Sequence, residues 1–190
     1  MSEMWVVKGK TGLSAIDEFQ TPLDECVKIA AHLGLPVVEL AIKSKSSGDG
    51  RPADGGNAVS SLKRRWITGE SAANSISSLI KEQDSPLVVL PSSVWWDDVA
   101  CRLAAHNGLQ AVIGSVGWRV EGPQRIGFLR PSFENRVMQE SFVTDHPCVV
   151  SLRRADGTGR HGETHSVARE RVLEVEKHKS DGLRFLDVHR

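Results

Sequence analysis

The residues best placed to do chemistry form a turn that reads Ser-Ser-Val-Trp-Trp-Asp-Asp after an apolar run. Ser92 and Ser93 can cap a helix or donate to a phosphate, and Trp95 could stack on an adenine. Asp97, however, would repel a phosphate. The turn also has no glycine that would let the backbone approach a phosphate closely. Two interpretations stay open. The first is a nucleotide (AMP or ATP) site formed by Ser92, Ser93, Trp95, Trp96 and Asp97. The second, which we favour, is a capped crossover helix whose Trp96 belongs to the core.

Other pairings of reactive residues are weaker. His161 and His165 flank Gly-Glu-Thr, a spacing that on a helix could share a metal. The glycine and the polar surroundings predict a loop, and no third ligand is evident, so we predict no metal site. Asp97 and Asp98 are adjacent, so on a helix they would diverge rather than act as an acid and base pair. No Ser-His-Asp order or Gly-x-Ser-x-Gly elbow is present, and we predict no catalytic residues.

Three cysteines, Cys26, Cys101 and Cys148, lie far apart and include no CxxC pair. This pattern predicts buried free thiols in a reducing cytoplasm, with Cys26 and Cys101 in helix cores. The chain balances 24 basic residues against 24 acidic ones, so no broad field recruits nucleic acid. No stretch approaches the length of a membrane-spanning helix, and we predict no membrane insertion.

Alternating apolar runs and amphipathic segments must position the turn. Apolar runs at 4–7, 35–42, 87–90 and 110–116 predict strands, with a weaker one at 64–68. Helices are predicted from Thr21 as cap and Pro22 as first residue to Gly34, at 71–84, and from Ser92 or Ser93 to Gly108. The alternation predicts a three-layer, doubly wound, mostly parallel α/β sheet, which is Rossmann-like or adenine-nucleotide-hydrolase-like.

The rhythm changes after Trp118. Runs at 125–130, 136–143 and 148–153 have no room for helices between them, and we predict an antiparallel meander attached to the sheet. Residues 154–170 are polar, 171–176 form a last short strand, and the rest is a charged tail. The predicted division is an α/β domain at 1–153 and a linker, strand and tail at 154–190.

Four pieces of sequence occur in a specific order: the run 87–91, "DDVACRLAAHNGL", "FLRPSFENRV" and "CVVSLRR". Together they resemble the N-terminal domain of the electron-transfer flavoprotein alpha subunit, over about 4–154. "RVLEVEK" resembles the strand that closes that domain. The departures are Trp95-Trp96 in place of Gly-Arg, Phe133 in place of tyrosine, and Asn135 in place of glycine.

The resemblance implies the fold and a heterodimeric partnership with a beta-like subunit or a flavin dehydrogenase; the alternative is a homodimer. The family's second domain, which holds FAD through a Gly-Gly-Arg-Gly-type stretch, has no counterpart here. Its beta subunits bind AMP at the comparable turn, so FAD or AMP would enter in a complex. Arg130, Pro131, Phe133 and Asn135 are either a partner contact or a hairpin turn with a solvated Arg and a core Phe.

Overall fold

The computed structural model describes residues 3–8, 22–44, 68–82, 87–123, 125–143, 147–153 and 169–175. Its helices and strands follow one another in an order that begins as the sequence predicts. They are β1 (Met4–Lys8), α1 (Leu23–Leu33), β2 (Val37–Ser44), α2 (Gly69–Glu82), β3 (Leu87–Pro91), α3 (Val94–Asn107), β4 (Gln110–Ser115), β5 (Gly117–Gly122), β6 (Arg125–Ser132), β7 (Val137–Val143), β8 (Cys148–Leu152) and β9 (Arg169–Val175).

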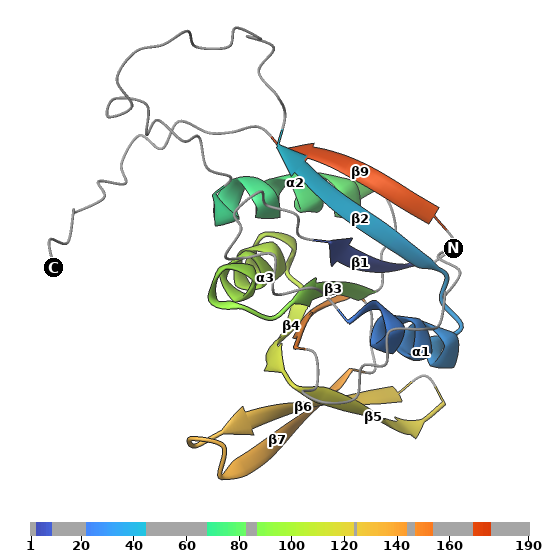
Figure 1. The fold of residues 1–190 in the computed structure, drawn as a ribbon, viewed down its shortest axis with the longest axis vertical. Helices are drawn as coiled ribbons and strands as arrows, with labels where there is room; N and C mark the ends of the chain where they lie inside the picture. The colour runs from blue at the N-terminus through green and yellow to red at the C-terminus, as the bar shows by residue number, and fades with distance from the viewer. Residues whose placement is uncertain are drawn as a thin grey trace, which may run out of the picture.

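The main sheet has six strands in the order β4-β8-β3-β1-β2-β9, and each neighbouring pair is parallel. Helices α2 and α3 cover one face, where Trp5, Ile76 and Trp96 share a core (Figure 1). Helix α1 covers the opposite face, where Ile29 packs with alternate residues of the same strands. The predicted doubly wound, three-layer α/β class is confirmed.

The composition of the central strands β3 and β8 follows from their burial on both faces. All five residues of β3 are buried, as are all five of β8, because helices or the small sheet cover both faces. A continuous apolar run such as Leu-Val-Val-Leu can satisfy this environment, whereas an alternating one cannot. Strand β8 therefore lies inside the sheet, between β3 and β4.

The place of β8 corrects one prediction. The antiparallel unit consists of β5, β6 and β7, in that order, and β8 is not its last strand. Strand β5 was missed because the run after Trp118 alternates polar and small residues around Arg119 and Glu121. The order of segments in the sequence suggested a meander, but β8 is apolar on both faces and pairs where two-sided burial is available.

The helix ends follow local chemistry. Gly34 and Gly108 end α1 and α3 at φ of 68° and 62°, the left-handed conformation that glycine adopts without strain. Pro22 stands at the cap position of α1 and makes no side-chain cap bond, so the helix begins one residue later than predicted. Thr68 precedes α2, where its Oγ1 accepts from the Ser71 amide at 3.1 Å.

The small sheet packs against the face of the main sheet that carries α1. Ile126, Phe128 and Val143 enter the core on that side. Two bonds tie β5 to α1: Trp118 Nε1 donates to Glu25 Oε2 at 2.8 Å, and His32 Nε2 donates to the Gly122 carbonyl at 2.9 Å. The base of the β6–β7 hairpin is thereby fixed to the body.

Several predictions fall on other parts of the chain. Residues 64–67, the His-Gly-Glu-Thr-His stretch and the predicted cap Thr21 lie outside the described residues. Strand β9 joins the main sheet beside β2, in register from Val38↔Arg169 to Ser44↔Val175. The division at residue 153 stays a prediction.

Candidate functional site

The predicted turn lies at the switch point of the main sheet. From β1 the chain passes through α1 to β2 on one side, whereas β3 lies on the other side and continues through α3 on the opposite face. In open α/β sheets ligands bind at the carboxyl ends of the strands that flank such a reversal. Ser92 and Ser93 directly follow β3, so the topology places them at this position.

The turn is built as a helix cap. Ser93 is extended, at φ −156° and ψ 166°, and its Oγ accepts from the Trp96 amide at 3.3 Å. The Ser92 amide donates to the Leu152 carbonyl at 3.1 Å, and Ser92 is buried. Trp96 is fully buried in the core, while the half-buried Trp95 meets it edge to face at a centroid distance of 4.5 Å. The core position of Trp96 and the cap at Ser93 are confirmed.

A phosphate does not fit the residues described at this turn. The Trp96 amide, one of the helix N-terminal donors that a phosphate would use, already donates to Ser93 Oγ. Asp97 brings a carboxylate to the first turn of α3, where it interacts favourably with the helix dipole and repels an anion. Each residue from Ser92 to Asp97 carries a Cβ, which keeps the backbone away from a bound group.

Buried polar atoms distinguish this edge of the sheet. Among the described residues, Trp96 Nε1, Asp97 Oδ1 and Ser115 Oγ are buried without a hydrogen-bond partner. The neighbouring Ser151 differs, because its Oγ accepts from the Gly114 amide at 2.7 Å. Gly114 has φ of 75° at the irregularity where β4 shifts register against β8. Sequence reasoning missed Ser115 and Ser151, because nothing in the serine pattern reveals which hydroxyl finds a donor.

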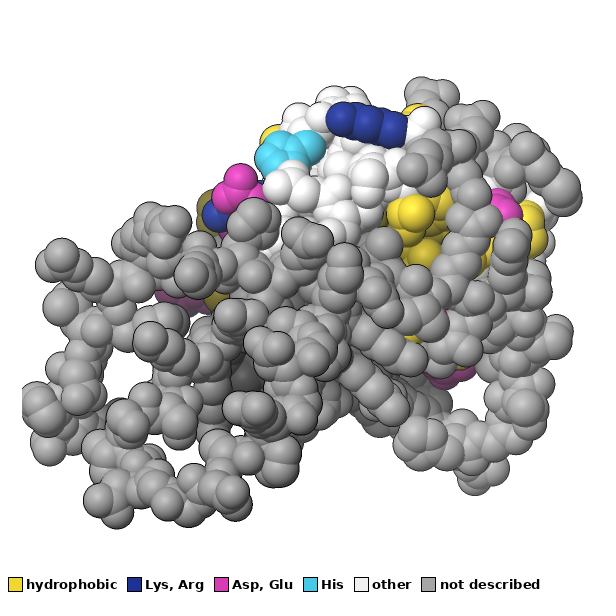
Figure 2. Space-filling model, turned by 90° about the horizontal axis from the view of Figure 1, so that it is seen from above, with side chains coloured by type: hydrophobic (Ala, Val, Ile, Leu, Met, Phe, Trp, Pro, Cys, Tyr) yellow, Lys and Arg dark blue, Asp and Glu magenta, His cyan; other side chains and the backbone are white. Residues whose placement is uncertain are grey.

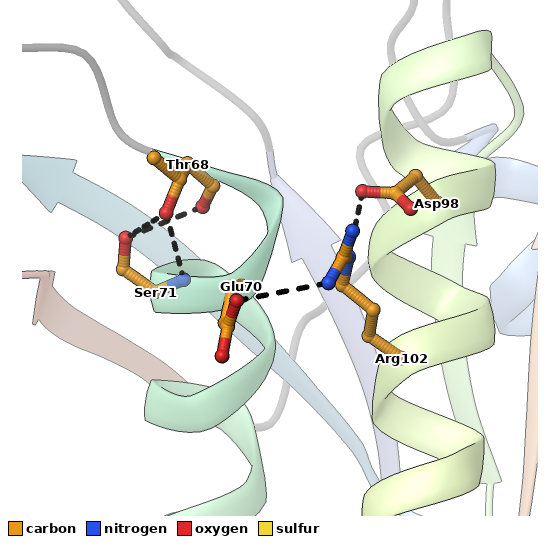
Figure 3. A network of polar contacts seen from close by, with 5 residues as sticks. All are labelled: Thr68, Glu70, Ser71, Asp98 and Arg102. Atoms are coloured by element: carbon orange, nitrogen blue, oxygen red, sulfur yellow. Dashed lines mark hydrogen bonds and ion pairs between the residues drawn. The ribbon is translucent and has the colours of Figure 1, made fainter. Parts of the chain in front are cut away.

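A polar network links the first turn of α2 to the middle of α3 (Figure 3). Arg102 donates to Asp98 at 2.9 Å and lies 3.7 Å from Glu70. The hydrogen bond to Asp98 is the main cause that raises the pKa of Arg102. A Cβ on Gly69 would lie 2.5 Å from Asp98 Oδ2, so glycine permits this close approach. Each charged group of this network has its partner within the network, and the contacts hold α2 against α3.

An open hollow of about 430 Å³ lies between α2 and α3 on the molecule's upper face. Figure 2 shows this face, where a histidine and a basic side chain lie at the edges of a white area of backbone and other side chains. The lining residues are Glu70, Asn74, Ser77, Ser78, Lys81 and His106. Lys81 and His106 occupy the last turns of their helices, where cations balance the helix dipole. The presence of basic residue types at these two positions is therefore explained without a ligand.

The cysteines divide into two environments. Cys26 and Cys148 are buried on the α1 side, and burial raises the pKa of the Cys148 thiol to about 12. Burial, followed by the charges of Asp24 and Glu25, also raises the pKa of Cys26. Cys101 is exposed, so its predicted core position is wrong: the outward face of α3 also carries Val94, which is 92% exposed. The described residues hold no group of three potential metal ligands.

The β6–β7 hairpin projects from the body (Figure 1). Phe133 at its turn is 78% exposed, so the interpretation of a core Phe is wrong. Phe133, Glu134 and Asn135 have φ of 50°, 55° and 65°. The Arg136 amide donates to the Phe133 carbonyl at 3.1 Å across Glu134 and Asn135, and a type I′ turn requires positive φ at these central positions.

This turn carries backbone strain. The left-handed conformation costs about 1–2 kcal/mol for an ordinary side chain and less for Asn. Asn135 stands where the resembled motif has glycine, and φ of 65° accounts for that choice. Phe133 adopts the same left-handed conformation although its side chain does not favour it. Its exposed ring is also not buried in the core. Strain held by an exposed aromatic points to a role other than stability.

The hairpin base is locked on its outer face. Arg119 donates to both carboxylate oxygens of Glu140, and this hydrogen bonding raises the pKa of Arg119. The Glu140 side chain crosses Gly127, where a Cβ would lie 2.9 Å from its Cδ. Beside it, the Arg125 guanidinium lies 4.3 Å from the centre of the Phe142 ring. Only glycine at 127 leaves room for the Arg119–Glu140 pair.

The main sheet with its helices, the turn after β3 and the β6–β7 hairpin together define a doubly wound α/β domain with a projecting hairpin. The sequence model of the electron transfer flavoprotein domain matches residues 67–170, more than half of the chain. The protein therefore belongs to the electron transfer flavoprotein family. A search of curated proteins returned no match. The matched range runs from α2 to the start of β9, so the resemblance over residues 4–66, and the choice of the alpha subunit, stay predictions. No helix among the described residues is long and apolar enough to cross a membrane.

Proposed function

We propose that the protein is an alpha-like subunit that acts as a docking scaffold in a flavin-dependent electron-transfer complex. It would form a heterodimer with a beta-like subunit or bind a flavin dehydrogenase. The flavin, held elsewhere in the complex, supplies the redox chemistry, and this chain contributes shape and interface. The family assignment over residues 67–170 supports an electron-transfer role. The three free cysteines support a reducing cytoplasm as the location.

The observation that carries the proposal is the hairpin turn on this family's domain. Arg130, Pro131, Phe133 and Asn135 lie on a projecting element, and the aromatic ring is 78% exposed. Arginine and aromatic side chains dominate the binding energy of many interfaces. A protein surface that covers Phe133 would remove its ring from water, which the isolated chain does not do.

We assign FAD to the partner rather than to this chain. The 190 residues contain no Gly-Gly-Arg-Gly-type stretch, on which the resembled family relies for flavin binding. The open hollow between α2 and α3 is lined by Glu70, Asn74, Ser77, Ser78, Lys81 and His106, which include no apolar residue to cover an isoalloxazine ring. Ligand sites of that size are mostly apolar.

A nucleotide site at Ser92, Ser93, Trp95, Trp96 and Asp97 is the second candidate. Its position at the switch point and the unpartnered, buried Asp97 Oδ1 favour it. The cap, the carboxylate and the absence of glycine oppose a phosphate there, so we rank it second. Saturable quenching of tryptophan fluorescence by AMP, abolished by Trp95→Ala, would reverse this order.

The test is co-purification. The chain carries an affinity tag in its native cell, and the bound proteins are identified by mass spectrometry. The proposal expects a beta-like flavoprotein subunit or a flavin dehydrogenase at about equal amounts, and a colourless chain after the partner is removed. A chain that retains stoichiometric FAD by itself, or that recovers neither partner, contradicts the proposal.

A further inference from the structure

The end of the hairpin is apolar on both faces as well as at its tip. Phe133 is 78%, Val137 50% and Met138 52% exposed. Val137 pairs with Ser132, and Met138 pairs with Pro131. Successive residues of a strand point to opposite faces, so Val137 and Met138 flank the tip on two sides. We refer to Phe133, Val137 and Met138 as the apolar tip.

Basic side chains accompany the apolar tip. Arg130 and Arg136 are both exposed, and neither forms an ion pair within the described residues. Glu134 is the one carboxylate between them. The two guanidinium groups therefore outnumber the acid, and they are free to meet carboxylates on another molecule.

Contacts at the base of the β6–β7 hairpin order it before a partner binds. Arg119 and Glu140 bridge the strands at its base, and Trp118 ties β5 to α1 through Glu25. The Arg136 amide closes the turn by donating to the Phe133 carbonyl at 3.1 Å. An element ordered before binding loses less entropy on association, which favours affinity.

We propose that the apolar tip enters an apolar pocket with an acidic rim on the beta-like subunit. This rests on the proposed function and adds the chemistry of the partner's surface and three residues, Arg136, Val137 and Met138, to the interface. A second copy of this chain is the poorer occupant. A symmetric contact between two tips would bring Arg130 and Arg136 of both copies together, and like charges oppose such an arrangement.

The experiment measures the Kd and the association rate for the purified beta-like subunit, together with the urea stability of each variant. Phe133→Gly removes the ring and relieves the strained φ. We expect Kd to rise by about 30-fold or more, while the urea midpoint stays constant or rises. The control variant Val120→Ala shortens an apolar side chain that is 49% exposed on β5, outside the hairpin. It should leave Kd within about threefold and the urea midpoint nearly unchanged.

The charge is tested separately. Arg130→Ala with Arg136→Ala should slow association several-fold at low salt and flatten its dependence on salt, because steering by complementary charge acts on the association rate. The same variants should leave the dissociation rate less affected than Phe133→Gly does.

The outcomes are distinguishable. If the wild-type chain binds the beta-like subunit but Phe133→Gly and the arginine variants bind equally well, this inference fails and the proposed function stands. If the wild-type chain does not bind the subunit, both fail. If Phe133→Gly instead abolishes self-association of the chain, a second copy occupies the tip and the inference is overturned.

Discussion

Ser115 and Ser151 are a matched pair on neighbouring strands, and we predict that their replacement by alanine has opposite effects. Both are 0% exposed, at the carboxyl ends of β4 and β8. Ser151 Oγ accepts from the Gly114 amide at 2.7 Å, whereas Ser115 Oγ has no partner among the described residues. The backbone of Ser115 is already bonded, since its carbonyl accepts from the Arg153 amide at 2.7 Å. The two serines therefore differ in whether the side-chain hydroxyl has a hydrogen-bond partner.

The expected magnitudes follow from this difference. Ser151→Ala leaves the partly buried Gly114 amide unpaired, which costs about 1 kcal/mol of unfolding free energy. Ser115→Ala removes a hydroxyl whose burial without a partner is itself unfavourable by about 1–3 kcal/mol. Allowing for the small void left by one oxygen, we expect Ser115→Ala to stabilise the protein by about 1 kcal/mol.

Urea unfolding followed by tryptophan fluorescence measures both effects, with Ser78→Ala, on the exposed face of α2, as a surface control within about 0.5 kcal/mol. Neither core variant touches the hairpin, so binding of the beta-like subunit should be unchanged. If both alanine variants destabilise the protein equally, Ser115 has a partner when folded, and our account of this edge is refuted.

Three further predictions concern the cap, the sheet anchor and the thiols. Ser93→Ala should lower the unfolding free energy by about 1 kcal/mol, measured by urea unfolding, because the Trp96 amide loses its cap. Trp118→Phe should cost about 1 kcal/mol and increase hydrogen exchange in β5, because the bond to Glu25 is lost. Iodoacetamide should label Cys101 alone in the native protein. Because burial raises the pKa of Cys148 from 9.0 to about 12, its stabilising contribution is complete below about pH 9 and is lost as the pH rises toward 12. The sequence has no tyrosine to obscure this decline, which a Cys148→Val variant should reduce.

The sequence predicted the elements whose environment is set locally. The run at β3 is apolar because both faces are buried, and the serine before α3 and the glycine after it mark ends that short-range hydrogen bonds determine. Trp96, predicted to lie in the core, is buried together with Val99, Ala100, Leu103 and Ala104, which form the inward stripe of α3. These features need no knowledge of distant partners.

The sequence could not predict which strands pair over long distances. Strand β8 follows the antiparallel unit in the chain but enters the main sheet between β3 and β4. An apolar run identifies a buried strand without naming its neighbours, so adjacency in the chain suggested the wrong sheet. Cys101 was misplaced for a related reason, since the exposed face of α3 is itself partly apolar and blurs the boundary of the stripe.

The candidate site was predicted in part. The resemblance pointed to the segment from Arg130 to Asn135, but Phe133 reads equally well as a core residue until its exposure is known. Asn135 signals a left-handed turn, because Asn tolerates positive φ; Phe133 gives no such signal, because aromatic side chains rarely adopt it. Val137 and Met138 were missed because their exposure depends on how far the hairpin projects beyond the body.

The most direct test of the docking account is sedimentation velocity of the purified chain mixed with the beta-like subunit, recorded at protein and flavin wavelengths. The account predicts a heterodimer whose flavin absorbance also sediments with the isolated partner, while the chain alone is colourless, and Phe133→Gly should shift the mixture toward separate species. Stoichiometric FAD absorbance that sediments with the chain alone, or two species that never combine, would contradict it.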